Sequence, residues 1–193
     1  MQSQKQYVEE LRKKLRRVKP GVENSYEIID EALDALSLAG KDQLTELTPE
    51  VFELLKCTDE DVRAEAVMTL SFNTRLRVAE FKETAYKIWL EDKHEGVRIA
   101  ALSSWISYYS GKKESKVLEV LYEILKNEDY SPDIRYTALS GMFDITREPS
   151  KFYKPFQSLF PIEKPFSHEQ FNKKVDWKEM EALMRKYVSG FVS

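Results

Sequence analysis

Apolar residues recur at helical spacing along most of the chain. Val62, Ala66 and Leu70 stand four positions apart, which places them on one stripe of an α-helix. The phrase VRAEAVMTL, residues 62–70, returns as VRIAALSSW and again as IRYTALSGM, with the second and third copies beginning 35 and then 37 residues further on. A fixed period in this range indicates stacked structural repeats.

Each copy of the phrase is preceded by short acidic or hydroxyl side chains, which suit the start of a helix. Before those side chains lies another apolar pattern of helical spacing, so each repeat predicts a helix, a short turn and a second helix. Small residues at the middle of the copies (Ala66, Ala101 and Ala138) allow a neighbouring helix to approach closely. Because one helix pair cannot bury its apolar face alone, neighbouring pairs must stack.

The repeated phrase resembles the second helix of HEAT-type repeats, including their short bacterial variety. The family pattern has an aspartate in the turn, followed by Val-Arg, a small residue and aliphatic residues. Asp92 and Asp129 stand six residues before the arginines of the second and third copies, as in the family, whereas the first copy has Cys57 at that position. The resemblance covers about residues 45–147 and implies a fold and a style of binding, but no particular chemistry.

The resemblance implies an all-α chain folded as an α-solenoid, a superhelix of stacked antiparallel helix pairs. It also implies a ladder between adjacent repeats, in which the turn acids pair with Arg63, Arg98 and Arg135. We assign these arginines to structure and not to function.

We expect a single domain over residues 1–193. Residues 1–40 predict a divergent first helix pair, residues 45–147 hold the three repeats, and residues 149–193 combine a segment rich in proline and aromatic residues with a final helix. The segment 149–166 is interpreted as a cover over the last repeat, with an aromatic binding patch as the alternative.

Local signals refine the ends of this scheme. The second helix is predicted to end near Leu38, with Tyr26 facing inward and Gly40 as its C-terminal stop. Ser167 and Gln170 resemble a capping box at the start of the final helix, which is predicted to run to about Val188.

Charge is unevenly distributed along the chain. The net charge is −3, but residues 1–20 hold seven Lys and Arg against two Glu, so the remainder carries −8. An acidic body argues against a broad nucleic-acid surface, which needs basic residues. Nucleic acid is therefore disfavoured as a partner, except through the basic first helix at Lys13, Lys14, Arg16 and Arg17.

The sequence predicts a cytoplasmic protein that does not bind a membrane. No apolar run approaches the roughly 20 residues that span a bilayer, and the first residues lack the apolar core of a secretion signal. Cys57 is the only cysteine and has no partner for an internal disulfide, which favours a reducing compartment.

No catalytic or metal-binding motif is evident, so we expect neither an enzyme nor a cofactor or metal. His94 is interpreted as an exposed turn residue and Cys57 as a small buried one, while the acids 59–61 are explained by a helix start. A HEAT-like DNA glycosylase remains an alternative, because such enzymes use a catalytic aspartate and aromatic residues and Asp144 lies on a repeat helix.

The leading hypothesis is a non-catalytic scaffold that binds another protein through the concave face of the solenoid. Candidate binding residues, counted off the buried stripes, are Glu65, Thr69, Phe72, Asn73, Ser104, Ser107, Tyr108, Thr137 and Asp144. An immunity protein that blocks a basic toxin is a special case that the acidic body favours. Nucleic-acid binding through the first helix is the second class.

Overall fold

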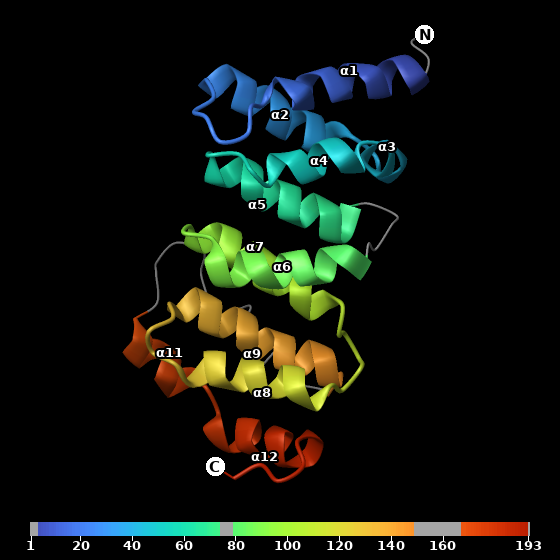
Figure 1. Ribbon diagram of the computed structural model, residues 1–193. Helices are drawn as coiled ribbons and strands as arrows, with labels where there is room; N and C mark the ends of the chain where they lie inside the picture. Colours follow the sequence, from blue (N-terminus) through green and yellow to red (C-terminus); the bar gives the residue numbers. More distant parts are fainter. Residues whose placement is uncertain (1–3, 74–78, 149–166, 193) are drawn as a thin grey trace. The chain divides into compact units, whose positions relative to one another are not determined.

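The computed structural model describes residues 4–73, 79–148 and 167–192, and the regular structure in these ranges is entirely helical (Figure 1). The all-α prediction is confirmed. The expected cover at 149–166 lies outside the described residues. The helices are α1 (Gln4–Arg17), α2 (Tyr26–Leu38), α3 (Lys41–Glu46), α4 (Thr48–Leu54), α5 (Glu60–Met68), the π-helix η1 (Thr69–Asn73), α6 (Ala79–Glu91), α7 (Glu95–Ser107), α8 (Ser115–Lys126), α9 (Pro132–Thr146), α11 (His168–Lys174) and α12 (Trp177–Tyr187).

The chain divides into two compact units, Met1–Trp105 and Ile106–Ser193. This division is finer than the single domain that the sequence predicts, and it falls inside α7, two residues before that helix ends. Each unit is described separately below.

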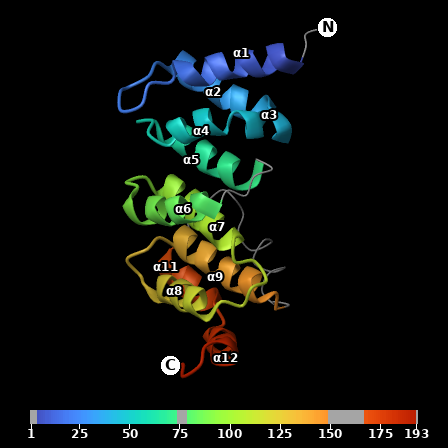
Figure 2. The same ribbon diagram turned by 45° about the vertical axis from the view of Figure 1, so that its right-hand side comes forward.

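In the first unit, helices pack as antiparallel pairs. The first helix of one pair contacts the first helix of the next, and the second helix contacts the second. α1 contacts both α2 and α4, while α5 contacts both α4 and α2. The first helices of consecutive pairs therefore form one layer and the second helices form another, and the turns of both pairs lie at the same end (Figures 1 and 2). The core of this layer contact is aliphatic and includes Leu15, Leu36, Leu54, Val62 and Ala66.

Local capping places the starts of the repeat helices. The Asp59 side chain accepts a hydrogen bond from the backbone N–H of Val62, and the Ser131 side chain accepts one from Ile134. A side-chain oxygen at this position satisfies a backbone donor that the first helical turn leaves unpaired. These caps fix where the first and third copies of the repeated phrase begin, and hence which of their faces is buried.

In the second unit, α8 packs along α9, and α12 contacts α8. The predicted capping box at the start of α11 is confirmed, since Ser167 accepts from the Gln170 backbone while the Gln170 side chain returns to the Ser167 backbone. The prediction of one final helix is wrong, because the chain turns at Val175 and Asp176 caps a separate helix, α12.

Two predictions in the first helix pair are also wrong. Tyr26 does not face inward, since its side chain is 83% exposed at the start of α2. Gly40 does not stop α2, whose C-cap is Ala39; it is instead the N-cap of the short helix α3, which the sequence reading missed.

Candidate partner-binding face

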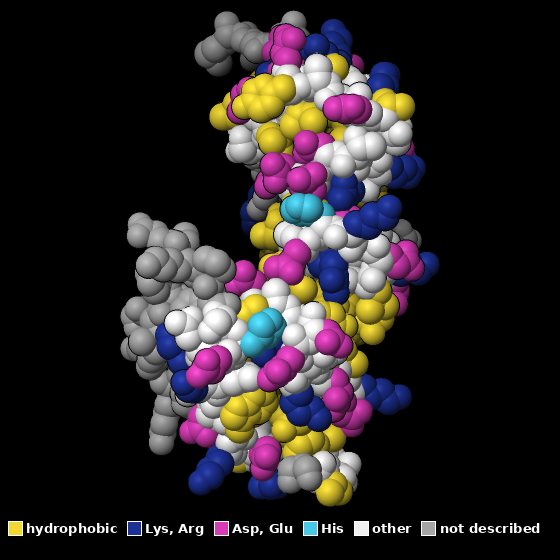
Figure 3. All heavy atoms as spheres, turned by 90° about the vertical axis from the view of Figure 1, so that its left-hand side faces the viewer, with side chains coloured by type: hydrophobic (Ala, Val, Ile, Leu, Met, Phe, Trp, Pro, Cys, Tyr) yellow, Lys and Arg dark blue, Asp and Glu magenta, His cyan; other side chains and the backbone are white. Residues whose placement is uncertain are grey.

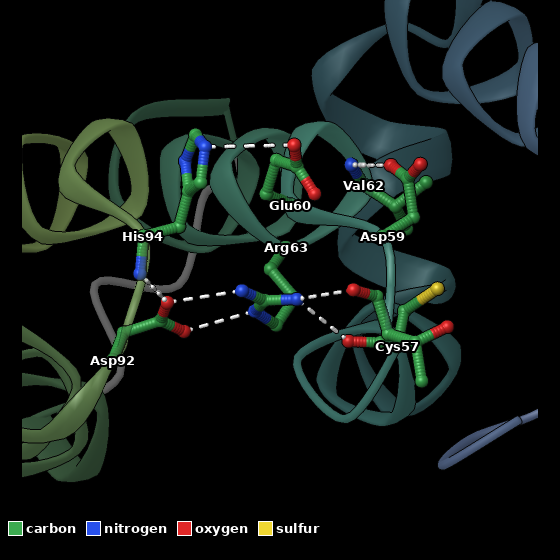
Figure 4. A network of polar contacts seen from close by, with 8 residues as sticks. Cys57, Asp59, Glu60, Val62, Arg63, Asp92 and His94 are labelled. Atoms are coloured by element: carbon green, nitrogen blue, oxygen red, sulfur yellow. Dashed lines mark hydrogen bonds and ion pairs between the residues drawn. The ribbon is translucent and has the colours of Figure 1, made fainter. Parts of the chain in front are cut away.

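Arg63 ties consecutive helix pairs of the first unit together (Figure 4). Its Nε and Nη2 donate to the two carboxylate oxygens of Asp92, at 2.8 and 2.9 Å, and its Nη1 donates to the carbonyl oxygens of Cys57 and Thr58 at 3.0 and 2.9 Å. Asp92 also accepts from the backbone N–H of His94 at 2.9 Å. The guanidinium thus joins the turn before α5 to the turn after α6.

The ionisation of both groups reflects this arrangement. The hydrogen bond to Asp92 raises the pKa of Arg63. Burial alone would raise the pKa of Asp92, but the hydrogen bonds from Arg63 and from the His94 backbone outweigh it, so the pKa of Asp92 is lowered. Both side chains are charged and mutually held, which supports the structural role that we assign to this arginine.

The other two arginines of the repeated phrase bond to the equivalent part of their own helix pair. Arg98 Nε donates to the carbonyl oxygen of Trp89 at 3.2 Å, and its guanidinium lies 4.8 Å from the centre of the Trp89 ring. Arg135 Nε donates to the carbonyl oxygen of Leu125 at 2.8 Å. Arg98 and Arg135 thus each bond to a carbonyl near the end of the first helix of their pair, whereas Arg63 bonds to carbonyls of the turn between α4 and α5.

Arg135 is almost fully buried, with 1% of its surface exposed. Its partner at the position where a turn acid is predicted is the side-chain amide of Asn172. Its Nη2 donates to Asn172 Oδ1 at 2.6 Å, its Nη1 lies 3.3 Å from His168 Nδ1, and its guanidinium lies over the Phe171 ring. Burial lowers the pKa of Arg135. The predicted pairing with a turn acid is thus observed for Arg63, whereas α11 supplies an amide and an imidazole to Arg135.

The predicted binding residues of the first unit are divided between surface and core. Phe72 is 38% exposed on η1, and Glu65 is half-buried on α5. The prediction that Thr69 and Ser104 lie off the buried seam is wrong, because both are fully buried. The side chain of Asn73 lies outside the described residues.

Packing against neighbouring helices explains the two buried residues: η1, which begins at Thr69, contacts α3 and α4, and Ser104 meets η1 from α7. The Ser104 hydroxyl on α7 makes a hydrogen bond with the buried hydroxyl of Ser71 on η1. Thr69 begins the π-helix, and its Oγ1 is buried with no hydrogen-bond partner. Small hydroxyl side chains fit a tight interface between helices, so a polar side chain at these positions does not indicate an exposed residue.

The remaining predicted residues belong to the second unit. Thr137 is half-buried and Asp144 exposed, and they stand two turns apart on α9. Ser107 ends α7 and Tyr108 lies in the following turn, both half-buried. These four do not share a helix, and they form a set separate from Glu65 and Phe72.

The basic face of α1 is largely engaged by carboxylates of its own unit. Arg16 donates to Glu50 on α4 through Nε and Nη2, at 3.1 and 2.7 Å, and Arg17 pairs with Glu31 on α2. Lys13 is exposed and Lys14 is half-buried. Two of the four cations proposed to meet nucleic acid thus have acidic partners within the protein.

Cys57 and His94 are the remaining side chains for which a chemical role was considered. Cys57 is buried, as expected, and His94 is exposed with Nε2 3.5 Å from Glu60 Oε1. On the face drawn in Figure 3, acidic and basic side chains lie around both histidines. Within the part of the chain that the structure describes, His, Cys, Asp and Glu side chains do not gather in threes suited to a metal ion.

Sequence reasoning missed the outer face of α2. Residues 22–38, which include this helix, contain no lysine or arginine. They carry five acidic residues: Glu23, Glu27, Asp30, Glu31 and Asp34. The signal is the run from Val22 to Gly40, which holds five acidic residues and no basic one.

No family model matches this chain, and neither a curated protein nor a solved structure matches it significantly. None of the described helices is long and apolar enough to cross a membrane.

Proposed function

We propose that this protein is a non-catalytic scaffold of HEAT-like stacked helix pairs, forming an α-solenoid that binds another protein through its second helices. The observation that carries the proposal is the bidentate Arg63–Asp92 ion pair, which links one helix pair to the next. HEAT-like repeats have a ladder of Asp–Arg pairs at this position. The layering of α1 with α4 and of α2 with α5 supports the same arrangement. In a stack of this kind, the outer side of the second helices is a continuous surface available to a partner.

The exposed side chains of those helices suit protein recognition. In the first unit, Phe72 is an exposed aromatic side chain on η1, and in the second unit, Asp144 is an exposed carboxylate on α9. Aromatic residues in such positions dominate binding energy, while charged neighbours set orientation. The acid partners of Arg16 and Arg17 favour this function over nucleic-acid binding by α1.

Affinity capture from a lysate of the source organism, followed by mass spectrometry, tests the proposal. The bait is the full chain, compared with Phe72→Asp and Asp144→Arg on the second helices. Matched controls are Glu10→Lys on α1 and Glu119→Lys on α8, both exposed on first helices.

We expect a stoichiometric protein that the controls retain and that at least one second-helix variant loses. Recovery of nucleic acid alone, released as salt rises, would overturn the scaffold function in favour of the basic first helix. A captured toxin whose activity the chain blocks would identify the immunity case within the same function.

A further inference from the structure

The outer sides of α2 and α5 can be compared position by position. The two helices touch, run in the same direction and begin at N-caps Ser25 and Asp59 (Figure 1). Counted from these caps, Glu27 corresponds to Asp61 and Asp34 to Met68. Phe72 follows on the π-helix η1, where the register of α5 no longer applies, so it is placed only by its position just beyond the end of α5. Because α2 and α5 contact each other and run in the same direction, we expect residues at similar distances from the two caps to lie near one another.

The first part of this shared surface is acidic. Glu27, Asp30 and Asp34 are exposed on α2, while Asp61 is exposed and Glu65 half-buried on α5. α2 contains no lysine or arginine. The one cation of α5, Arg63, is held by Asp92 and by backbone carbonyls, so it does not neutralise this surface.

The last part of the same surface is apolar. Leu38 is 68% exposed, Phe72 38% and Met68 37%, and all three stand near the C-terminal ends of their helical segments. Large apolar side chains are costly to leave in water when they gather, and such a patch beside polar residues marks an interaction site. We call the set Glu27, Asp30, Asp34, Leu38, Asp61, Glu65, Met68 and Phe72 the acidic–apolar face.

We propose that the acidic–apolar face binds a basic amphipathic segment of another protein. This inference rests on the proposed scaffold function and adds the chemistry of the partner. Lysine or arginine side chains of the segment lie against the carboxylates of the N-terminal halves, and its apolar side chains cover Leu38, Met68 and Phe72. Amphipathic helices are commonly recognised through their apolar side, and opposite charges beside the apolar contact set orientation.

Charge excludes the other occupants. A second copy of this chain would bring the same carboxylates against their own kind, and like charges across an interface repel. Nucleic acid would meet only negative charge here. The chain's own basic helix, α1, lies in the other layer, where Arg16 and Arg17 already pair with Glu50 and Glu31.

The first test uses synthetic peptides and the full-length protein. The probe is a fluorescent amphipathic peptide of lysine and leucine, and its Kd is measured by anisotropy at low ionic strength and at about 0.15 M salt. A glutamate–leucine peptide of the same pattern and a shuffled lysine–leucine peptide serve as comparison probes. We expect the ordered basic peptide to bind at least about tenfold more tightly than either.

Paired variants separate this face from general attraction to an acidic protein. Asp30→Lys with Asp34→Lys alters the acidic part, and Glu10→Lys with Glu119→Lys makes the same change of net charge elsewhere. Leu38→Ser with Phe72→Ser alters the apolar part, and Leu90→Ser alters an apolar residue that is 55% exposed on α6. All substituted side chains are exposed, and circular dichroism checks that the variants fold.

We expect each face variant to weaken the basic peptide about tenfold or more, and each control to change Kd by less than about threefold. In the charge variant, the Kd of the basic peptide should depend less on salt concentration, because the ion pairs that salt screens are those formed by the carboxylates of this face. Equal losses in the face and control variants, or equal binding of ordered and shuffled peptides, would overturn the assignment.

Capture from the lysate with the same variants distinguishes this inference from the function on which it rests. Loss of the protein partner from both face variants supports both. A partner that binds the face variants as well as the native chain overturns the acidic–apolar face and leaves the scaffold function standing. Failure to capture any protein overturns the scaffold function.

Discussion

At the scale of single residues, the repeated arginine shows how one side chain type serves related positions differently. Arg63 meets a carboxylate, whereas Arg135 meets an amide oxygen and an imidazole. In both positions the guanidinium also donates to a backbone carbonyl of its own helix pair, in the turn after α4 for Arg63 and near the end of α8 for Arg135. The arginine thus links the two helices of its pair even where its side-chain partner changes.

Replacing Arg63 with lysine should destabilise the protein by about 1–3 kcal/mol, because an ammonium group cannot make the paired contacts of a planar guanidinium. The side chains of Arg63 and Asp92 are only 15% and 13% exposed, so solvent cannot replace the lost bonds easily. Urea denaturation measures the change. Arg185→Lys, in an exposed pair with Glu181, is the control and should cost less than about 1 kcal/mol. Equal costs at both positions would contradict the structural role.

The same pair predicts a dependence of stability on pH. The folded-state pKa of Asp92 is lowered, so its contribution is fully present above the unfolded value of about 4 and is lost as pH falls through the folded value. Asp92→Asn should therefore lose less stability than the native chain when pH is lowered from about 5 to about 2. Denaturation midpoints across this range give the comparison, and parallel curves for the two proteins would contradict it.

Residue identity alone did not predict which polar side chains are buried. Helical counting places Ser104 and Thr69 off the buried seam, but both are buried: Ser104 bonds to Ser71 of the neighbouring second helix, and Thr69 begins η1, which packs on α3 and α4. The π-helix beginning at Thr69 also shifts the register of the residues that follow, and no local signal marked it. Burial at such positions depends on the adjacent helix pair, which a single stripe does not describe.

At the scale of elements, local signals were the more reliable. The capping box at Ser167 was predictable because its two hydrogen bonds involve residues three positions apart. The break before α12 was not, although Asp176 and Glu179 resemble a helix start, because the apolar pattern from Phe171 through Val175 to Met180 continues across it. A change of direction that keeps the apolar face buried leaves the periodicity intact.

The placement of α11 predicts that Asn172→Asp stabilises the protein. A carboxylate would give the buried Arg135 guanidinium an opposite charge, as Asp92 gives Arg63, and we expect a gain of about 1 kcal/mol near neutral pH. Repulsion from Glu128, which now accepts from Asn172 Nδ2, is limited because Glu128 is exposed. Thermal unfolding measures the gain, which should disappear below about pH 4 as the new carboxyl is protonated. A loss of stability at neutral pH would show that the amide's bond to Glu128 matters more than charge compensation.

At the scale of the whole molecule, repetition in the sequence predicted continuity, whereas the structure divides inside α7. The repeated phrase reports how each helix pair is built, and it carries no information on how strongly one pair holds the next. Each unit nevertheless has its own buried aromatic residue, Phe81 in the first and Phe171 in the second. These two side chains offer a direct way to ask whether the units unfold separately.

We expect Phe81→Ala and Phe171→Ala to give opposite patterns of amide hydrogen exchange. Removing a fully buried phenylalanine costs about 3–5 kcal/mol, and where helices contact mainly their neighbours the loss falls mainly on nearby elements. Phe171→Ala should thus lower protection in α8, α9, α11 and α12 while α1, α2 and α4 keep theirs, and Phe81→Ala should do the reverse. Phe72→Ala, at an exposed position of the acidic–apolar face, controls for loss of an aromatic ring and should change neither pattern. A uniform loss of protection across all helices in either core variant would show instead that the two units fold as one cooperative body, because local damage would then be shared by every helix pair.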